Sequence, residues 1–286
     1  MGRRPPTVHG MVLIDKPAGM TSHDVVAQLR KRFKERRIGH AGTLDPDATG
    51  LLVVGVGNAT RLLRFATSSF KTYEVEIVLG IETDTLDSSG QVVAEHQMLV
   101  QATQVAEAAR ALTGEIEQIP PMVSARRVGG RSLHELAREG KEVEREARSV
   151  TIRKFHVRAT TDPLIRSAVI DCSAGTYIRT LGADLGTALQ GGAHIRNLRR
   201  TQSGVFGIEE SDAILEAPLQ PVRQFADQTL EADELLVQQL AKSSELFSIA
   251  QRLRRHHLVE LFGIRLIERF FRDIREVVFR PPRGAG

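Results

Sequence analysis

A glycine-rich loop built around a single carboxylate is the feature that most constrains this chain. The loop covers residues 39–50 (GHAGTLDPDATG), and Asp45 stands directly before Pro46 within it. Glycine adopts backbone angles that other residues avoid, and the proline disfavours helical geometry at the residue before it. An Asp-Pro pair alone is more often a self-capped turn than a ligand site. The loop as a whole is far more specific, because it can hold a carboxylate towards a ligand outside any helix.

Length and composition predict a globular protein with one large domain. The chain has 286 residues, of which 41% are hydrophobic, and no apolar run is long enough to cross a membrane. No apolar segment follows the charged N-terminus, so we expect no secretory signal. The single cysteine, Cys172, excludes an internal disulfide and a cysteine-rich zinc site. We therefore expect a cytoplasmic protein that does not associate with membranes.

Arginine carries almost all of the positive charge. The formal net charge is +4, from 39 Lys and Arg residues against 35 Asp and Glu residues. Arginine pairs bidentately with phosphate and stacks on bases, which suits an RNA-binding protein. Four basic runs together carry enough charge to follow an RNA stem, at residues 30–37, 126–131, 148–153 and 196–200. A solvated helix face explains the first run equally well.

The pattern of apolar residues predicts a mixture of strands and helices. Strands are predicted at residues 10–15, 51–56, 71–80, 150–157, 164–173 and 204–208, and helices at 25–36, 58–65, 103–112, 133–138 and 178–189. Thr21 and Asp24 have the spacing of a capping box at the start of the first helix. In the third strand, Tyr73 belongs to an apolar face, whereas Glu74 and Glu76 belong to the opposite one.

The same pattern divides the chain into one domain with additions. We expect residues 1–9 to be disordered and residues 10–210 to form the domain. A heavily charged insert at about 122–150 projects from it. Residues 211–286 have a helical, basic pattern with apolar residues every three or four positions. We expect no cofactor and no metal, because the chain has neither a phosphate-cradling loop nor clustered Cys and His ligands.

Further motifs flank the Asp45 loop. They are residues 13–22 (LIDKPAGMTS), 71–73 (KTY), 175–180 (GTYIRT) and 194–201 (HIRNLRRT). Together with the loop they resemble, in order and spacing, the motifs of the TruB family of tRNA pseudouridine synthases. The resemblance extends from residue 10 to about residue 210.

The resemblance implies a fold and a reaction. The fold is α+β, the pseudouridine synthase fold, with a mixed, mainly antiparallel sheet, flanking helices and a cleft across the sheet. The implied enzyme isomerises uridine 55 in the T-loop of tRNA to pseudouridine, on a base flipped out of the RNA. The N1–C1′ glycosidic bond is replaced by a C5–C1′ bond. We expect a monomer whose insert grips the T-arm stem-loop of tRNA.

The resemblance also implies roles for individual residues. Asp45 is the essential catalyst, and it either adds to C1′ or takes a proton from the ribose. Arg179 pairs with Asp45 and keeps it ionised. Tyr73 stacks on the flipped uracil and takes part in catalysis. The other implied substrate contacts are Tyr177 on the base or ribose, His40 in the vacated base stack, the main chain of Leu198 at the uracil edge, and Lys16 as a structural or phosphate contact.

Three alternatives and three departures accompany this interpretation. A hydrolase would cleave the same glycosidic bond and release free uracil, whereas a non-catalytic relative would only bind or fold RNA. A guide-RNA-dependent relative normally carries a small β-rich PUA domain, which the pattern of residues 211–286 does not suggest.

Val123, Arg127 and His134 replace an aromatic residue, a lysine and a tyrosine of the family pattern. These replacements make up two departures, which bear on tRNA affinity because they lie in the insert. The third is that many bacterial members of the family end in a PUA domain, whereas residues 211–286 have a helical, basic pattern.

Overall fold

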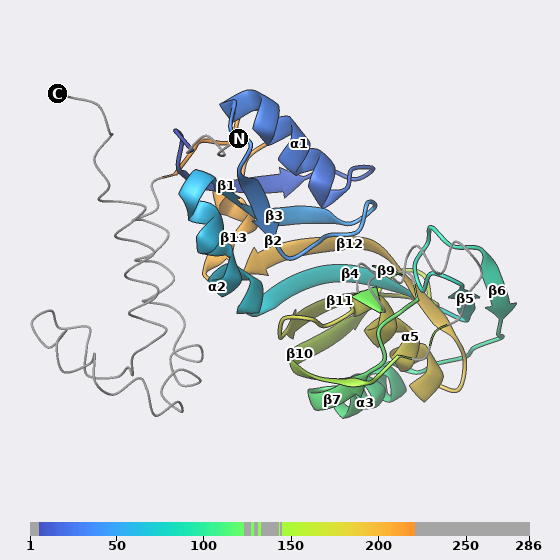
Figure 1. Cartoon of the computed structure of the whole chain (residues 1–286). Helices are drawn as coiled ribbons and strands as arrows, with labels where there is room; N and C mark the ends of the chain where they lie inside the picture. Colours follow the sequence, from blue (N-terminus) through green and yellow to red (C-terminus); the bar gives the residue numbers. More distant parts are fainter. Residues whose placement is uncertain (1–5, 123–126, 129–130, 133–142, 144, 221–286) are drawn as a thin grey trace, which may run out of the picture. The chain divides into compact units, whose positions relative to one another are not determined.

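The computed structural model describes residues 6–122, 127–128, 131–132, 143 and 145–220 (Figure 1). The chain divides into two compact units. Unit 1 comprises Met1–Pro46, Gly50–Ser69 and Gln202–Gly286, and unit 2 comprises Asp47–Thr49 and Phe70–Thr201. The predicted helix at 133–138 and most of the insert lie outside the described residues, as do Val123 and His134.

Unit 1 is built on three antiparallel strands, and β3 pairs with both β1 and β2. Its elements are β1 (Gly10–Lys16), α1 (Ser22–Phe33), β2 (Ile38–Ala41), β3 (Thr49–Val56), η1 (Gly57–Arg61), α2 (Leu63–Ser68), β13 (Phe206–Gly207) and η2 (Ile208–Glu210). Successive residues of β1 enter two different cores. Val12 and Ile14 pack with residues of α1, whereas Met11 and Leu13 pack with residues of α2. Both faces of β1 are therefore buried.

The first helix begins and ends at recognisable caps. The Thr21 side chain accepts a hydrogen bond from the Asp24 amide, and the Asp24 carboxylate accepts one from the Thr21 amide. This is the predicted capping box, but it starts the helix at Ser22 rather than at residue 25. Lys34 adopts a left-handed conformation with φ 52° and ends the helix at Phe33, before the predicted residue 36.

Both ends of the described chain in unit 1 differ from expectation. Residues 6–9 were expected to be disordered, yet the Thr7 amide donates to Glu35 and the Asn58 amide donates to His9. Residues 211–220 were expected to be helical but form no helix. The amide of Gln220 instead donates to the Met11 carbonyl at 2.8 Å. Non-local hydrogen bonds to β1 explain this difference, while residues 1–5 and 221–286 lie outside the described part.

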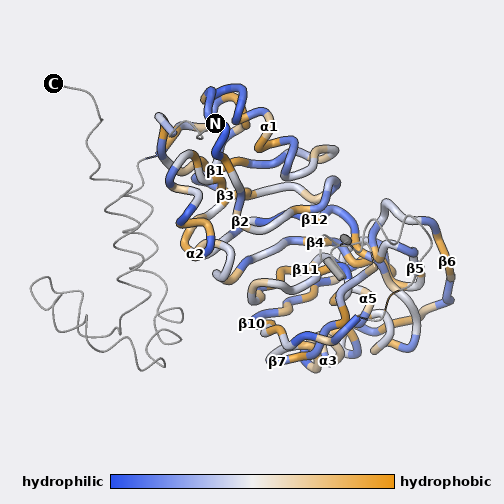
Figure 2. Tube along the Cα trace, in the orientation of Figure 1, coloured by the Kyte–Doolittle hydropathy of each residue, from blue (hydrophilic) through white to orange (hydrophobic). Residues whose placement is uncertain are grey.

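Unit 2 contains strands in the order β12, β4, β11, β10 and β7. Its elements are β4 (Lys71–Leu79), β5 (Ile81–Thr83), β6 (Val92–Glu95), α3 (Ala102–Ala111), β7 (Gly114–Gln118), β8 (Arg127–Val128), β9 (Arg131–Ser132), β10 (Arg148–Ala159), β11 (Ile165–Cys172), α5 (Ile178–Ala188) and β12 (Ala193–Ser203). β4, β11, β10 and β7 pair antiparallel in succession. Helix α3 contacts both β10 and α5. Buried residues alternate with half-exposed ones along β11. The hydropathy, which Figure 2 shows along the chain, does not follow this alternation throughout, because Arg166 is buried and Val169 is half-exposed.

The predicted α+β class is confirmed. Every strand pair with a described register is antiparallel. The sequence did not predict β2, β7 or β12 as strands. These three strands are short or strongly charged, so their apolar alternation is weak. No helix in the described part of the chain is long and apolar enough to cross a membrane.

Candidate active site

The Asp45 loop is anchored to the start of α1. The Ser22 hydroxyl accepts a hydrogen bond from the Leu44 amide at 2.9 Å and lies 3.2 Å from the Leu44 carbonyl oxygen. Both Ser22 and Leu44 are buried, whereas Asp45 is half-exposed. Gly42, at the start of the loop, has a φ of 82° that favours glycine. Leu44, the residue before Asp45, is therefore held in place by α1, and this fixes the position from which the Asp45 carboxylate extends.

Lys16 fastens the other side of the same loop. Its side chain is completely buried, and Nζ donates to the carbonyl oxygens of Pro17, Met20 and Pro46 at 2.9, 2.6 and 3.0 Å. The Gly19 amide donates to the same Pro46 oxygen at 3.0 Å. Of the two roles considered for Lys16, these contacts favour the structural one. A fully buried ammonium offers no surface to a phosphate.

His40 lies on β2, whose last three residues are the first three of the loop. Its ring meets that of His23, on α1, edge to face with the ring centres 5.6 Å apart. His40 is half-exposed. The sequence did not single out His23, because it belongs to none of the motifs. The pair places an imidazole beside the chain segment that carries Asp45.

In unit 2, the tyrosine of the KTY motif is buried in the sheet. Tyr73 lies on β4 opposite Ile170 of β11 and is 9% exposed. It shares its face with the buried Val75 and Ile77, as the alternation predicted. Its role in stacking on a base stays a prediction.

Tyr177 stands at the N-terminal cap of α5 and is held by a glutamine. The Tyr177 amide donates to Gln118 Oε1 at 3.0 Å, and Gln118 Nε2 donates to the Tyr177 carbonyl at 3.3 Å. Gln118 is 2% exposed and lies at the end of β7. This two-way bond fixes the main chain where α5 begins. No sequence pattern indicated Gln118, because 59 residues separate the two partners.

Arg179 is buried in the first turn of α5 and has an acidic partner that the sequence analysis missed. Its Nε lies 3.6 Å from Asp87 Oδ2, and Nη1 donates to the Thr85 carbonyl at 3.1 Å. Asp87 Oδ1 in turn accepts from the hydroxyls of Thr85 and Ser89 and from the Ser89 amide. The turn at residues 83–90 therefore holds the guanidinium of Arg179 in a fixed direction, which is its aiming role.

The expected pair between Asp45 and Arg179 stays a prediction. Asp45 belongs to unit 1, and Arg179 belongs to unit 2. Asp87 is thus the acidic partner of Arg179 that lies within the same unit. The aspartates in the string TDTLDSSG were the available signal, but the sequence pattern of this segment indicated only a polar turn.

Leu198 lies on β12 and is half-exposed. The residue before it, Asn197, has a φ of 53° in the middle of the strand. The residue after it, Arg199, donates from Nη1 to Thr49 Oγ1 at 3.4 Å. The exposure of Leu198 distinguishes it from a plain core leucine. We refer below to the left-handed backbone conformation of its neighbour Asn197 as the bend.

Cys172 is excluded as a nucleophile by its surroundings. Its side chain is 1% exposed, and burial raises the pKa of the thiol to about 12. A thiol must ionise to act as a nucleophile or a metal ligand. Within the described ranges, no group of three or more His, Cys, Asp or Glu side chains is arranged to hold a metal ion.

Two sequence models of protein families match the chain. The model for the TruB family pseudouridylate synthase N-terminal domain matches residues 30–178. The model for the tRNA pseudouridylate synthase B C-terminal domain matches residues 179–246. The chain belongs to the TruB family of tRNA pseudouridine synthases. It is therefore an isomerase, as the motifs predicted, and the second match crosses the expected boundary at residue 211.

Individual proteins give the same result. The tRNA pseudouridine synthase B of Mycobacterium sp. (strain KMS) is 49% identical over 216 residues, which are 73% of each chain. That of a Bacillus cereus strain is 46% identical over 210 residues, which are 71% of this chain and 68% of the relative. Both relatives carry the name that the motifs implied.

Solved structures share the fold. A crystal structure of a Cbf5-Nop10-Gar1 complex matches 71% of this chain with a TM-score of 0.57 and 30% identity. A structure of an H/ACA RNP bound to a substrate RNA matches 72% with a TM-score of 0.53 and 28% identity. The match covers 52% and 51% of those two chains, so this chain spans about half of each.

Proposed function

We propose that this pseudouridine synthase converts uridine 55 in the T-loop of tRNA to pseudouridine. The observation that carries the proposal is the Asp45 loop, which keeps the family motif intact and is fixed from both sides by Ser22 and Lys16. A half-exposed carboxylate on a fixed loop is suited to meet a sugar, because reactions at C1′ of a glycoside use a carboxylate in this way.

The proposed reaction needs a carboxylate and a held base, and it is balanced without a redox partner. Asp45 either adds to C1′ or removes a ribose proton, and in both routes the N1–C1′ bond breaks. The uracil then rotates and C5 bonds to C1′, while the Asp45–C1′ bond breaks in the first route or the ribose regains its proton in the second. C5 loses its proton to solvent and N1 takes one up. In this scheme Arg179 keeps Asp45 ionised, Tyr73 stacks on the base, and Tyr177 contacts the base or ribose.

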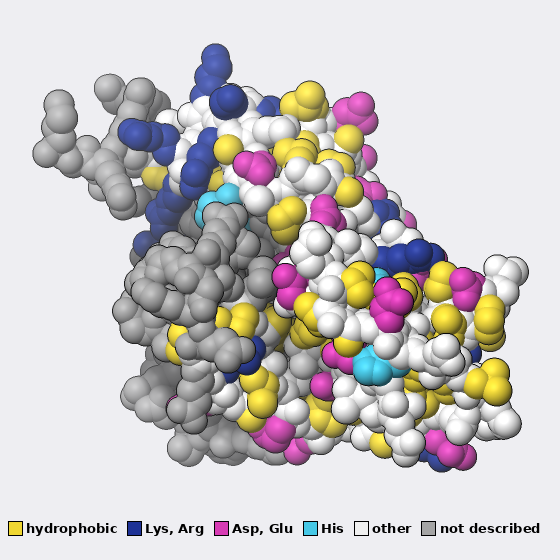
Figure 3. All heavy atoms as spheres, turned by 90° about the vertical axis from the view of Figure 1, so that its right-hand side faces the viewer, with side chains coloured by type: hydrophobic (Ala, Val, Ile, Leu, Met, Phe, Trp, Pro, Cys, Tyr) yellow, Lys and Arg dark blue, Asp and Glu magenta, His cyan; other side chains and the backbone are white. Residues whose placement is uncertain are grey.

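The proposed partner is the T-arm stem-loop, bound by a cytoplasmic monomer. Part of the predicted basic surface is available for it and part is used by the fold. Arg30 and Arg32 donate to main-chain carbonyls, whereas Lys31, Lys34 and Arg36 are exposed at the end of α1. Figure 3 shows lysine and arginine side chains gathered near the top of that view. Exposed cations attract the phosphate backbone of RNA without reading its sequence.

Tritium release tests the proposal and its alternatives together. The substrate is a T-arm stem-loop that carries uridine labelled with tritium at C5, and the control replaces the target uridine by cytidine. The proposed isomerase releases tritium to water and leaves the mass of the RNA unchanged. Free uracil in the supernatant would identify a hydrolase. Binding without any release would identify an RNA-binding protein that has lost catalysis.

A further inference from the structure

The bend at Asn197 is unusual for the middle of a strand. Asn197 lies within β12 and has a φ of 53°, whereas strand residues have strongly negative φ values. A residue other than glycine adopts this left-handed conformation only at a cost, although asparagine tolerates it better than most. A bend of this kind persists when surrounding contacts hold it, and it is frequent at functional sites.

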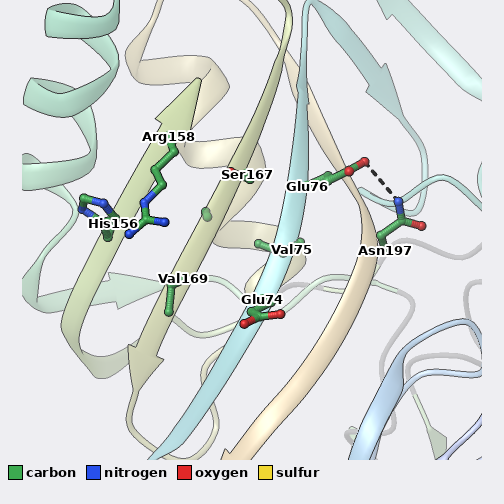
Figure 4. A pocket seen from close by; sticks show the side chains of 9 residues that line it. Glu74, Val75, Glu76, His156, Arg158, Ser167, Val169 and Asn197 are labelled. Carbon is green, nitrogen blue, oxygen red and sulfur yellow. Dashed lines mark hydrogen bonds between the residues drawn. The ribbon is translucent and has the colours of Figure 1, made fainter. Parts of the chain in front are cut away.

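One carboxylate oxygen supplies those contacts. Glu76 Oε2 accepts a hydrogen bond from Arg196 Nε at 2.6 Å. The same oxygen accepts another from Asn197 Nδ2 at 3.0 Å (Figure 4). Glu76 lies on β4, so it reaches two consecutive residues of β12 that are more than a hundred positions away in the chain. These two residues immediately precede Leu198. The carboxylate therefore clamps the bend from the neighbouring strand.

The clamp is on the face of β4 opposite Tyr73. Glu74 and Glu76 alternate with the buried Tyr73 and Val75, as the two faces of a strand require. Glu76 and Asn197 line a cavity of about 350 Å³, together with polar and apolar residues of β4, β10 and β11 (Figure 4). The same strand thus carries a proposed base-stacking residue on one face and the clamp on the other.

We propose that Glu76 is a positioning residue for the isomerisation. By holding Asn197 in its left-handed conformation, it sets the direction of the main chain at Leu198, which faces the uracil edge in the proposed function. It does not touch the substrate. The inference rests on the proposed function, since only a base placed at Leu198 would make the bend matter for catalysis.

Glu74 provides a matched control. It lies two residues before Glu76 on the same face of β4, lines the same cavity and is more exposed. Glu76→Ala and Glu74→Ala remove the same atoms from neighbouring positions. The Glu76 side chain is 33% exposed and that of Arg196 is 41% exposed, so the ion pair adds little to stability. Both variants should therefore fold.

The experiment measures single-turnover tritium release and binding of the T-arm stem-loop. In Glu76→Ala the rate should fall between about tenfold and a hundredfold, since small displacements of substrate-positioning groups have effects of this size. The dissociation constant should stay within about twofold, because phosphate contacts supply most of the affinity. Glu74→Ala should match the wild type in both measurements, and Glu76→Gln should lose less than Glu76→Ala because its amide oxygen still accepts.

A glycine at position 197 should restore the rate that is lost when Glu76 is replaced. A merely structural role of Glu76 would not produce this rescue. Glycine adopts positive φ without a clamp, so the double variant Glu76→Ala/Asn197→Gly should regain most of the lost rate. If Glu76→Ala is as active as Glu74→Ala, or if Asn197→Gly restores nothing, the positioning role is wrong. The wild-type protein tests the proposed function in the same assay, because its failure to release tritium would refute that function whatever the variants do.

Discussion

The ammonium of Lys16 donates a 3.0 Å hydrogen bond to the carbonyl oxygen of Pro46, the residue directly after Asp45. Lys16 stands at the end of β1 and is completely buried. A buried charge is costly unless hydrogen bonds compensate it, and here three carbonyl oxygens do so. The position of the proposed catalytic residue thus depends on a cation that the solvent does not reach.

Replacing that cation should harm both the fold and the reaction. Lys16→Met keeps roughly the length of the side chain but leaves the carbonyls of Pro17 and Met20 without this donor, and Pro46 keeps only the Gly19 amide. We expect the free energy of unfolding to fall by about 2 kcal/mol, because two part-buried acceptors lose this donor and each orphaned acceptor costs about 1–3 kcal/mol when it is buried. Urea unfolding measures the loss. Lys31→Met, at an exposed position of α1, is the control and should change it by less than about 0.5 kcal/mol.

Asp45→Asn separates catalysis from binding. The amide has nearly the shape of the carboxylate but can neither add to C1′ nor take a proton. We expect tritium release to fall by at least about three orders of magnitude, which corresponds to about 4 kcal/mol of transition-state stabilisation. The dissociation constant for the stem-loop should hardly change. Asp47→Asn is the matched control, since Asp47 is exposed in the same loop. A rate above a few per cent of wild type would disprove the role of Asp45.

Asp87→Asn tests the hold on Arg179. The substitution removes the charge that faces the guanidinium at 3.6 Å but keeps an oxygen able to accept the bonds from Thr85 and Ser89. We expect kcat to fall on the order of tenfold, which equals about 1.4 kcal/mol. Asp84→Asn, three residues earlier in the same turn, should leave kcat unchanged, because Asp84 bonds the Gln91 amide and not the arginine. Equal kcat values for the two variants would refute the aiming role.

The buried thiol makes stability depend on pH in the alkaline range. Burial raises the pKa of Cys172 from 9.0 to about 12 in the folded protein. The thiol ionises at a lower pH in the unfolded chain than in the folded protein. The free energy of unfolding therefore has its full value below pH 9 and falls as the pH rises from 9 towards 12. We expect Cys172→Ala to reduce this alkaline fall in the unfolding free energy. Urea titrations at pH 8 and pH 10 measure it, and an identical fall in both proteins would contradict the assignment.

Local patterns predicted the parts of the fold that depend on neighbouring residues. The alternation around Tyr73 indicated β4 and its two faces, and the Thr21 capping box placed the start of α1 within a few residues. The motifs also indicated the Asp45 loop and the start of α5. In these cases the residues that decide the structure lie within one turn or one strand of each other, so the sequence displays them together.

Local sequence patterns could not predict contacts between distant segments. Gln118 holds Tyr177 across 59 residues, and Arg179 reaches the Thr85 carbonyl across 94. The bend at Asn197 depends on Glu76 of another strand, and nothing in the sequence around Asn197 signals a positive φ. Non-local hydrogen bonds of this kind follow only from the way distant elements come together in the fold. The candidate catalytic residues were therefore predictable, whereas the residues that orient them were not.

The role of the C-terminal region can be tested by truncation, and the structure indicates where the chain should be cut. Residues 211–220 belong to the body of unit 1, since Ile214 and Ala217 are buried and Gln220 bonds with Met11 of β1. A truncation after Ile208 would remove these contacts, so the cut should follow Gln220. The segment removed, 221–286, lies outside the described residues. Its arginine-rich part includes Arg252, Arg254, Arg255, Arg265, Arg269 and Arg272.

We expect the truncated protein to bind full-length tRNA more weakly, by about tenfold at physiological salt, and to bind the isolated T-arm stem-loop within about twofold of the full chain. The reason is that added arginines reach further phosphates only where the RNA continues beyond the stem-loop. The slope of log affinity against log salt should also become shallower for tRNA, by about 0.7–0.9 for each phosphate that the truncated protein no longer neutralises. Replacing the six arginines by glutamine in the full chain is the control for the change in mass. If both RNAs bind the truncated and full chains equally, the region has no role in RNA binding.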